Sequence, residues 1–252
     1  SDDPLRMVGE HYDEDQRLSF YQETNNTTAL CMLALNKLIL FYLFEQYEQA
    51  VEQAEIATRY LNAVQGQSNV AVCLFFEALA CLARCQAVSE AEQVPLLDKV
   101  QANLHQLETW AGHAPSNYEH KCELIKAERS YVQGDNVAAR EHYDNAIEQA
   151  VNNEYVNEEA LANELAARFY LSRKQRHVAR HYLRDAVYAY ARWGAIAKVQ
   201  QLEQKHQEML GQMTYATMVR GTLTTFTTTT TTTRTTEHSV GVLDFMSILK
   251  AS

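Results

Sequence analysis

The stretch "YEQAVEQAEIA", from Tyr47 to Ala57, decides how this chain folds. Its small residues Ala50, Ala54 and Ala57 follow Tyr47 at intervals of 3, 4 and 3 residues, which places all four on one face of an α-helix. Small side chains let a second helix approach closely, while aromatic side chains fill the remaining space. The stretch therefore predicts a helix that packs tightly against a partner helix.

The same spacing recurs twice further along the chain, in "GDNVAAREHYDNA" and in "RHVARHYLRDA". Trp193 and Gly194 then predict a helix end, because glycine readily adopts the left-handed conformation that ends a helix. We expect Trp193 to pack on the adjacent hairpin, with stacking on a ligand as the weaker alternative. The residues that we expect to pack helix against helix are Tyr47, Ala50, Ala54, Ala57, Gly134, Ala139, Tyr143, Ala146, Ala179, Leu183, Ala186, Trp193 and Gly194.

Helical periodicity extends from about Thr27 to Leu210. Short polar interruptions divide this segment into roughly eight helices of ordinary length. Helices joined by such short turns lie antiparallel to their neighbours and form hairpins. The interruptions fall near Glu45-Gln46, Gly66-Gln67, Ser89-Glu90, Gly112 to Ser116, Gly134-Asp135, Asn152-Asn153 and Ser172 to Gln175.

These helix pairs resemble the tetratricopeptide repeat, a 34-residue helix-turn-helix unit that stacks into a solenoid with a concave surface. The units are irregular here. The interval from Ala139 to Ala179 is longer than one such repeat, and the pair between Asn69 and Gly112 has a longer second arm that contains Pro95. We predict an all-α fold, a tetratricopeptide-like solenoid of antiparallel helix pairs, followed by a disordered Thr-rich linker.

Composition narrows the class of protein. Only 8 glycines and 3 prolines occur among 252 residues, and tight β-turns depend on these residues. A net charge of -10 argues against a nucleic-acid surface, which needs clustered positive charge. The most apolar run, Ala29 to Phe44, contains Asn36 and Lys37 and is shorter than the roughly 20 apolar residues of a membrane span. We expect a cytoplasmic protein that binds neither nucleic acid nor membrane, with reduced thiols at Cys31, Cys73, Cys81, Cys85 and Cys122.

The C-terminal region has a different character. The tract "TTFTTTTTTTRTT" lacks the apolar surface needed to offset ordering entropy, which predicts a linker, although its threonines as phosphorylation or glycosylation targets stay an alternative. An apolar pattern then resumes in "VLDFMSILKAS", so we expect the chain to be part of a longer protein. The predicted divisions are a partly helical lead-in (1–26), a helical-repeat domain (27–211), the Thr-rich linker (212–241) and the start of a helix leading into a following GAF-like domain (242–252).

Two stretches carry a more specific resemblance: "QETNNTTAL", Gln22 to Leu30, and "AVYAYARWGAIAKVQQLEQKH", Ala186 to His206. With "KLILFYLFEQYEQAVEQAEIATRYL" they resemble the helical region in the middle of large multi-domain signalling kinases. The final "LDFMSILKAS" resembles the approach to the GAF domain in that family. The resemblance covers about Tyr12 to His206 and the last segment. In that family a serine/threonine-kinase-like domain and a P-loop ATPase module precede the helical region, and a GAF sensor domain and a histidine kinase follow it.

The resemblance implies a non-catalytic scaffold or regulatory segment of a signalling kinase. It implies no cofactor in this segment, ATP in the parent protein, and contacts with other domains of the same chain or with a protein partner. The alternative is a repeat domain that binds a small-molecule or peptide effector, as in helical-repeat transcription activators. For the chain itself we predict no catalytic, cofactor-binding or metal-binding residues.

Two histidines suggest a third hypothesis, a metal-dependent hydrolase. His177 and His181 are four residues apart on one helix face, a spacing that can hold a metal ion. The pattern lacks the glutamate of the zinc-protease motif, and neighbouring arginines would repel a cation. Cys81 and Cys85 have the same spacing but no second pair of ligands, which favours buried thiols.

The same region is the most basic in the chain. In an acidic protein it predicts a docking patch for an acidic partner or for another domain, with a solvated helix face as the alternative. The patch residues are Arg168, Arg173, Lys174, Arg176, Arg180 and Arg184.

Overall fold

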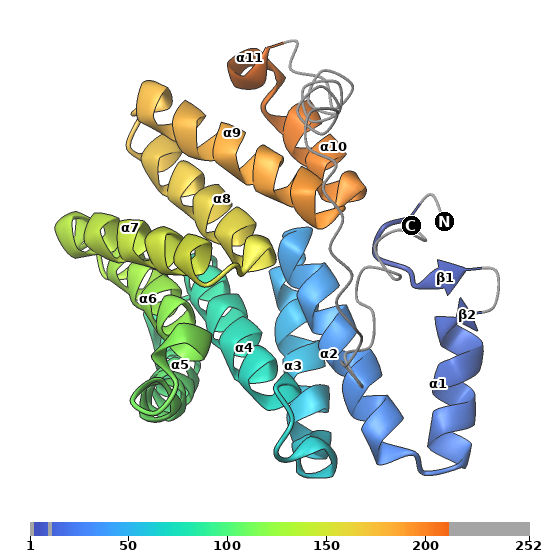
Figure 1. The fold of residues 1–252 in the computed structure, drawn as a ribbon. Coiled ribbons are helices and arrows are strands. Elements are labelled where there is room, and N and C mark those ends of the chain that lie inside the picture. The colour runs from blue at the N-terminus through green and yellow to red at the C-terminus, as the bar shows by residue number, and fades with distance from the viewer. Residues whose placement is uncertain (1–2, 10–11, 212–252) are drawn as a thin grey trace, which may run out of the picture.

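The computed structural model describes residues 3–9 and 12–211, and over these residues the chain is almost entirely helical (Figure 1). The prediction of an all-α chain is confirmed there, apart from two strands of two residues each. These strands, β1 (Val8–Gly9) and β2 (Tyr12–Asp13), pair antiparallel, with Val8 opposite Asp13. The predicted Thr-rich linker and the predicted helix at 242–252 lie outside the described residues.

The helices follow one another with short connections. Their bounds are α1 (Glu14–Glu23), α2 (Thr27–Leu43), α3 (Tyr47–Tyr60), the 3-10 helix η1 (Leu61–Val64), α4 (Asn69–Cys85), α5 (Glu90–Ala111), α6 (Pro115–Val132), α7 (Asn136–Asn152), α8 (Val156–Ser172), α9 (Arg176–Trp193), α10 (Ile196–Lys205) and α11 (Gln207–Leu210).

Every predicted interruption falls at a turn or at a helix end. The last predicted segment is divided further, because Gly194 has a φ of 88° and ends α9 before α10 and α11 begin. Side-chain caps start several helices. Asn26 accepts a hydrogen bond from the Ala29 amide of α2 at 3.0 Å, and Asp135 accepts one from the Ala138 amide of α7 at 3.1 Å.

Six of the turns between helices share one geometry. A residue with positive φ follows the helix, and the next amide donates back to the carbonyl five residues earlier, as in Asp135 N to Ser130 O at 2.9 Å. This is the Schellman arrangement, which satisfies carbonyls left free at a helix end. The positive-φ residues recur at equal intervals over the second half of the array, at Gly134, Glu154, Lys174 and Gly194. Asn25 and Glu45 are separated by the same interval, so one turn geometry and one helix length repeat at both ends of the array.

The small residues of the recurring pattern lie between paired helices, and we call these contacts the alanine seams. The pairs in closest contact are α2 with α3, α6 with α7, and α8 with α9. Each pair buries its small residues, since the side chains concerned are at most 1% exposed: Ala50, Ala54, Ala57, Ala139, Ala146, Ala179 and Ala186. Tyr143 and Leu183 are buried in the same rows. Burial of these rows is what allows each hairpin to pack closely.

The array curves, so that its end returns towards its beginning. Figure 1 shows the helices following one another around a bend, with α10 near the upper end of α2. At that point Lys198 of α10 donates a hydrogen bond to the carbonyl of Leu43, the last residue of α2. Residues 155 positions apart in the chain therefore meet.

The N-terminal lead-in is fastened to α2. Lys37 of α2 donates to the Leu5 carbonyl at 2.6 Å and pairs with Glu14 of α1 at 2.9 Å. Met7 is only 6% exposed and packs in the core. Within the described residues, no helix has the length and apolar character needed to cross a membrane.

Candidate functional site

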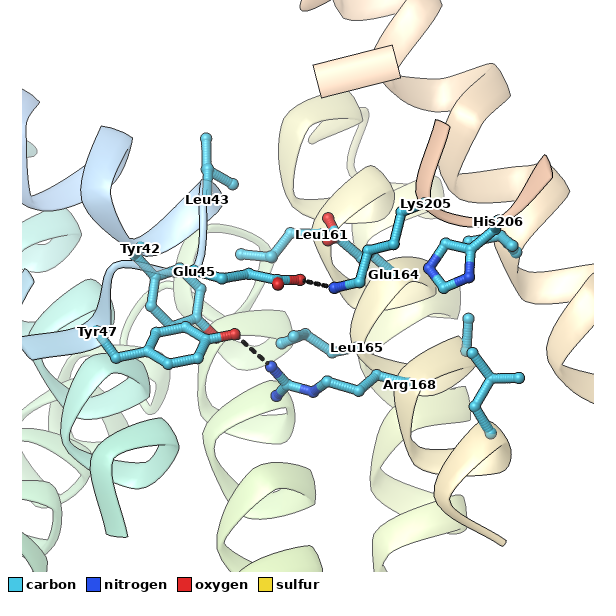
Figure 2. Close-up of a pocket in the computed structure, with 13 residues that line it drawn as sticks. Tyr42, Leu43, Glu45, Tyr47, Leu161, Glu164, Leu165, Arg168, Lys205 and His206 are labelled. Atoms are coloured by element: carbon cyan, nitrogen blue, oxygen red, sulfur yellow. Dashed lines mark hydrogen bonds and ion pairs between the residues drawn. The ribbon is translucent and has the colours of Figure 1, made fainter. Parts of the chain in front are cut away.

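A cavity of about 120 Å³ lies where the α2–α3 turn faces α8 and the segment from α10 to α11 (Figure 2). We call this region the closure cleft. Aliphatic side chains line much of it: Leu43, Leu161, Leu165, Ala167, Leu171 and Leu183. The polar side chains at its wall are Tyr42, Glu45, Tyr47, Glu164, Arg168, Lys205 and His206.

Arg168 of α8 contacts two other helices directly and a third through Glu128. One guanidinium nitrogen, Nη1, donates to the Tyr47 hydroxyl at 2.8 Å, and Nη2 pairs with Glu128 of α6 at 2.5 Å. Glu128 is fully buried and also accepts a hydrogen bond from the Tyr143 hydroxyl of α7. Burial would lower the pKa of Arg168, but Glu128 together with Tyr47, Tyr42 and Tyr143 outweighs it and holds that pKa well above its ordinary value. The buried carboxylate thus has a charged partner and a second donor, as such a group requires.

Lys198 of α10 forms the second connection. Its side chain is 1% exposed, and its Nζ pairs with Glu164 at 2.7 Å and donates to the Gln201 side chain at 2.8 Å as well as to the Leu43 carbonyl. Tyr190 donates its hydroxyl proton to the other oxygen of Glu164 at 2.7 Å. Three acceptors therefore surround this ammonium group, whose three N–H donors need them in a dry interior.

The rim of the cleft is more open. Lys205 pairs with Glu45 of the α2–α3 turn (Figure 2). Burial would raise the pKa of Glu45, but the hydrogen bond and the charge of Lys205 outweigh it and leave the pKa below its ordinary value. His206 is half-buried beside this pair; burial, and then the Lys205 charge, lower its pKa. The rim is therefore an ion pair next to a histidine that resists protonation.

Two polar atoms at the wall of the cleft have no hydrogen-bond partner: the Tyr42 hydroxyl and the Arg168 Nε. Tyr42 is 2% exposed, and its ring packs at 5.7 Å from the ring of Tyr47. Burial, followed by the nearby Glu128 charge, raises the pKa of Tyr42 well above its ordinary value, so its hydroxyl keeps its proton and can donate.

A second buried polar cluster lies between α6 and α8. Glu158 is 5% exposed and pairs with His120 and, at 2.8 Å, with Lys121. Tyr155 covers the cluster, with its ring 4.3 Å from that of His120 and 4.4 Å from the Lys121 Nζ. Burial would raise the pKa of Glu158, but Lys121 and His120 outweigh it and lower that pKa. The cluster joins α6 to α8 through buried ion pairs, which favours a structural role.

The predicted basic patch does not hold together as one surface. Arg168 lines the closure cleft, where its guanidinium group pairs with the buried Glu128. The other five cations are exposed around the α8–α9 turn and along α9: Arg173, Lys174, Arg176, Arg180 and Arg184. Arg176 pairs with Glu208 at 3.2 Å, although both side chains are largely in solvent.

The structure places the two paired histidines on the surface and the cysteines in the interior. His177 and His181 are both exposed on α9. In residues 3–9 and 12–211, no group of three His, Cys, Asp or Glu side chains is placed to hold a metal ion. The five cysteines are unpaired and buried, and burial raises the pKa of Cys73, Cys81 and Cys122 to about 12. Thiols with so high a pKa are poor nucleophiles at neutral pH.

Sequence reasoning missed most of the closure cleft, which depends on residues up to 160 positions apart. One local signal was present. Glu128 and Lys198 are charged residues on otherwise apolar helix faces, four and one positions from the buried Leu124 and Val199. A charge in such a position needs a partner, although the sequence does not say which residue supplies it.

Comparison with known proteins adds no relative: no family model, no curated protein and no solved structure matches this chain.

Proposed function

We propose that this chain is a tetratricopeptide-like helical-repeat segment that acts as a non-catalytic scaffold and regulatory element of a multi-domain signalling kinase. Its units are longer than the common 34-residue repeat, as the interval from Gly134 to Lys174, which spans two helices and two turns, indicates. In this proposal it lies between an ATPase-like module and a sensor and kinase module of the same cytoplasmic protein. It contacts other domains or a protein partner, and ATP binds elsewhere in that protein.

The observation that carries the proposal is the closure cleft. An open repeat array transmits contacts mainly from each unit to the next. Here Lys198 and Lys205, both on α10, are held to Leu43 and Glu45 of the first long hairpin. A displacement of the first hairpin would therefore change the contacts of α10 without passing through all the intervening helices.

Such a direct connection suits a segment that passes a change of state from one end to the other. If the α2–α3 turn has two positions, the position that keeps Lys198 paired also fixes α10, and the other releases it. A partner or domain that prefers one position would shift the equilibrium by the difference in its affinity for the two. No chemistry is needed at the cleft for this role.

The connection can be tested by hydrogen exchange in the full chain with Lys198→Met. We expect faster amide exchange both in α10 and at the α2–α3 turn, because both ends lose the same anchor. Arg192→Met is the matched control, since the Arg192 side chain is exposed and neither it nor its partner Glu159 lines the cleft. Faster exchange confined to α10 would contradict the transmission role.

The parent protein can be tested by sequencing the coding region on both sides of the segment. We expect a P-loop module upstream, and a GAF domain with a histidine kinase downstream. A start codon directly before Ser1 and a stop codon directly after Ser252 would contradict the interdomain role. Nucleotide hydrolysis or phosphoryl transfer by the segment alone would contradict the non-catalytic role.

A further inference from the structure

One position on the second helix of a pair contacts the second helix of the pair that follows. Glu55 of α3, Asp144 of α7 and Arg184 of α9 each lie five residues after the first buried alanine of their helix. Glu55 pairs with Lys99 of α5 at 2.9 Å. Asp144 accepts a hydrogen bond from the Tyr182 hydroxyl of α9 at 2.6 Å. Arg184 therefore occupies the position at which α9 would meet a further second helix.

At this position α9 has no such neighbour in the part of the chain that the structure describes. Arg184 is exposed, as is Arg180 one turn earlier, and neither guanidinium group has an ion-pair partner among residues 3–9 and 12–211. The elements that follow are short: α10 has 10 residues and α11 has 4, whereas α8 has 17 and α9 has 18 (Figure 1). Over the described residues, the array thus ends without a second helix of ordinary length after α9.

The flank of α9 around Arg184 is basic, whereas Glu55 and Asp144 make the equivalent positions acidic. Arginine or tyrosine occurs at every fourth residue of α9 from its first residue, and residues four apart lie one above another on a helix. Glu208 of α11 already provides one carboxylate here, since it pairs with Arg176 at 3.2 Å. We call this flank the arginine row, and its members, all of them exposed, are Arg176, Arg180, Arg184, Tyr188 and Arg192.

We infer that the arginine row is the docking site of an acidic helix from a partner protein, which packs on α9 as a further second helix would. Carboxylates spaced four residues apart on that helix face guanidinium groups with the same spacing, and each guanidinium can hold a carboxylate through two parallel hydrogen bonds. Tyr188 is 44% exposed, and the Arg192 guanidinium lies 5.6 Å from the centre of its ring. Arginine and tyrosine are enriched at the centres of protein–protein contacts, so the row has the composition of an interface.

The neighbouring surface favours a narrow acidic partner. Glu141, Asp144 and Glu148 are exposed on α7, and Asp185 adjoins Arg184 in the chain. A DNA duplex or an anionic membrane spreads its charge over a wide surface and would meet these carboxylates as well as the row. A single acidic helix contacts the row alone.

The acidic helix is assigned to another protein on two grounds. Residues 212–252 contain only two acidic residues, Glu237 and Asp244. On α3, the acidic second helix at the other end of the array, Glu48 already pairs with Arg84, and Glu55 with α5. Neither the following segment of this chain nor α3 of a second copy thus presents a free row of carboxylates.

The docking role rests on the proposed function only in assuming a partner protein, and its test is independent of the closure cleft. The probe is a fluorescent peptide of about five Glu-Ala-Ala-Leu repeats, titrated with the full chain and followed by anisotropy. Its control has glutamine in place of glutamate. We expect only the acidic peptide to bind, with an affinity that falls at least about tenfold between roughly 0.05 and 0.5 M salt. No binding of the acidic peptide, or equal binding of the glutamine peptide, would overturn the docking role while leaving the exchange result for Lys198→Met unaffected.

The second experiment locates the site. Arg180→Glu combined with Arg184→Glu should weaken binding of the acidic peptide at least about tenfold, and should create binding of the same peptide with lysine in place of glutamate. Arg17→Glu combined with Arg59→Glu is the matched control, because both arginines are exposed outside the row and the net charge changes equally. All four positions are exposed, so circular dichroism should show the same helix content and unfolding midpoint in every variant. Equal weakening in the two double variants would overturn the location.

Other occupants of the row would give different results. Tighter binding of a DNA duplex of about 20 base pairs, or of phosphatidylserine vesicles, than of the acidic peptide would overturn the assignment of an acidic helix if the Arg180→Glu, Arg184→Glu variant lost it. Sedimentation of the full chain alone tests a second copy. Self-association that the same variant abolishes would assign the row to another copy of this chain and overturn the partner protein.

Discussion

The alanine seams and the closure cleft both hold helices together, but they do so by opposite means. In the seams, side chains such as Ala54 and Ala146 are small, apolar and at most 1% exposed, and their partners lie on the adjacent helix of the hairpin. In the cleft, Arg168 and Lys198 bring charges into the interior and meet partners that are distant in the chain, such as Glu128 and Leu43. The seams give stability through packing, whereas the cleft gives a specific closed shape that depends on a few groups.

This difference predicts different responses to substitution. A larger side chain in a seam destabilises it by overpacking, and repacking of neighbouring side chains lowers part of that cost. Removal of one charged partner in the cleft leaves the other charge buried without its partner, a cost that repacking does not lower. Four kinds of substitution test this difference, and they follow from the largest expected effect to the smallest. They change the Arg168 ion pair, a seam alanine, the turn residues and His206.

The largest effect is expected for Arg168→Leu. It leaves the fully buried Glu128 with only the Tyr143 hydroxyl, and loss of one partner from a buried ion pair costs about 3–5 kcal/mol of the free energy of unfolding. The measurement is urea denaturation at pH 7. Arg180→Leu, at an exposed position of α9, is the control and should change stability by less than about 0.5 kcal/mol.

The double variant Arg168→Leu with Glu128→Leu sharpens this result. Replacing both partners removes the unpaired charge, so the double variant should be more stable than Arg168→Leu alone. If the double variant is less stable than the single one, the cost does not come from a stranded Glu128, and the account of the cleft is wrong.

The next effect is expected in a seam. Ala146→Leu adds methylene groups between α6 and α7 at a position that is 1% exposed, and overpacking typically costs about 1–3 kcal/mol. Ala102→Leu is the matched control, because Ala102 lies on the exposed face of α5. Equal stability of Ala146→Leu and the wild type in urea denaturation would mean that the seam is loosely packed.

The two regions also differ in how far the sequence predicts them. Spacing within one helix identifies Ala50, Ala54 and Ala57 as a buried row, since a helix face is a local property. The long interval from Ala139 to Ala179 reads as an irregularity in the sequence, whereas in the structure it matches the equal spacing of the turns at Gly134, Glu154 and Lys174. Arg168, in contrast, looks like one more cation of a basic stretch. Its place in the cleft depends on the curvature of the whole array, which brings Tyr47 within hydrogen-bonding distance. No local sequence pattern encodes that curvature.

Substitutions at two equivalent turns should change stability by smaller amounts and in opposite directions. Lys174 occupies a positive-φ position, with a φ of 60°, where glycine carries no steric cost, so Lys174→Gly should stabilise the chain by about 0.5–1 kcal/mol. Gly134→Ala, at the equivalent turn with a φ of 81°, should destabilise it by about 1 kcal/mol, although a Cβ there meets no atom within 4 Å. Both are measured by thermal unfolding. The same sign for both changes would mean that the turns are not equivalent.

The smallest expected effect is a response of stability to pH that arises at His206 in the cleft. Burial, and then Lys205, lower the pKa of His206; Lys198 acts in the same direction, while Glu164 and Glu45 oppose it. The unfolded chain takes up a proton near a pKa of about 6.5, and the folded chain does so only at lower pH. Between these two pKa values the unfolded state binds more protons, so the free energy of unfolding falls as the pH is lowered from neutral through about 6.5.

His206→Gln should flatten this part of the curve of unfolding free energy against pH. His181→Gln, on the exposed face of α9, is the control and should leave the slope in place. Ala146→Leu should lower stability at every pH by the same amount, because that seam position is remote from the titrating group. An unchanged slope in His206→Gln would remove the cleft as its source. A slope altered by Ala146→Leu would show that seam and cleft are coupled, and the two regions would then have to be treated as one.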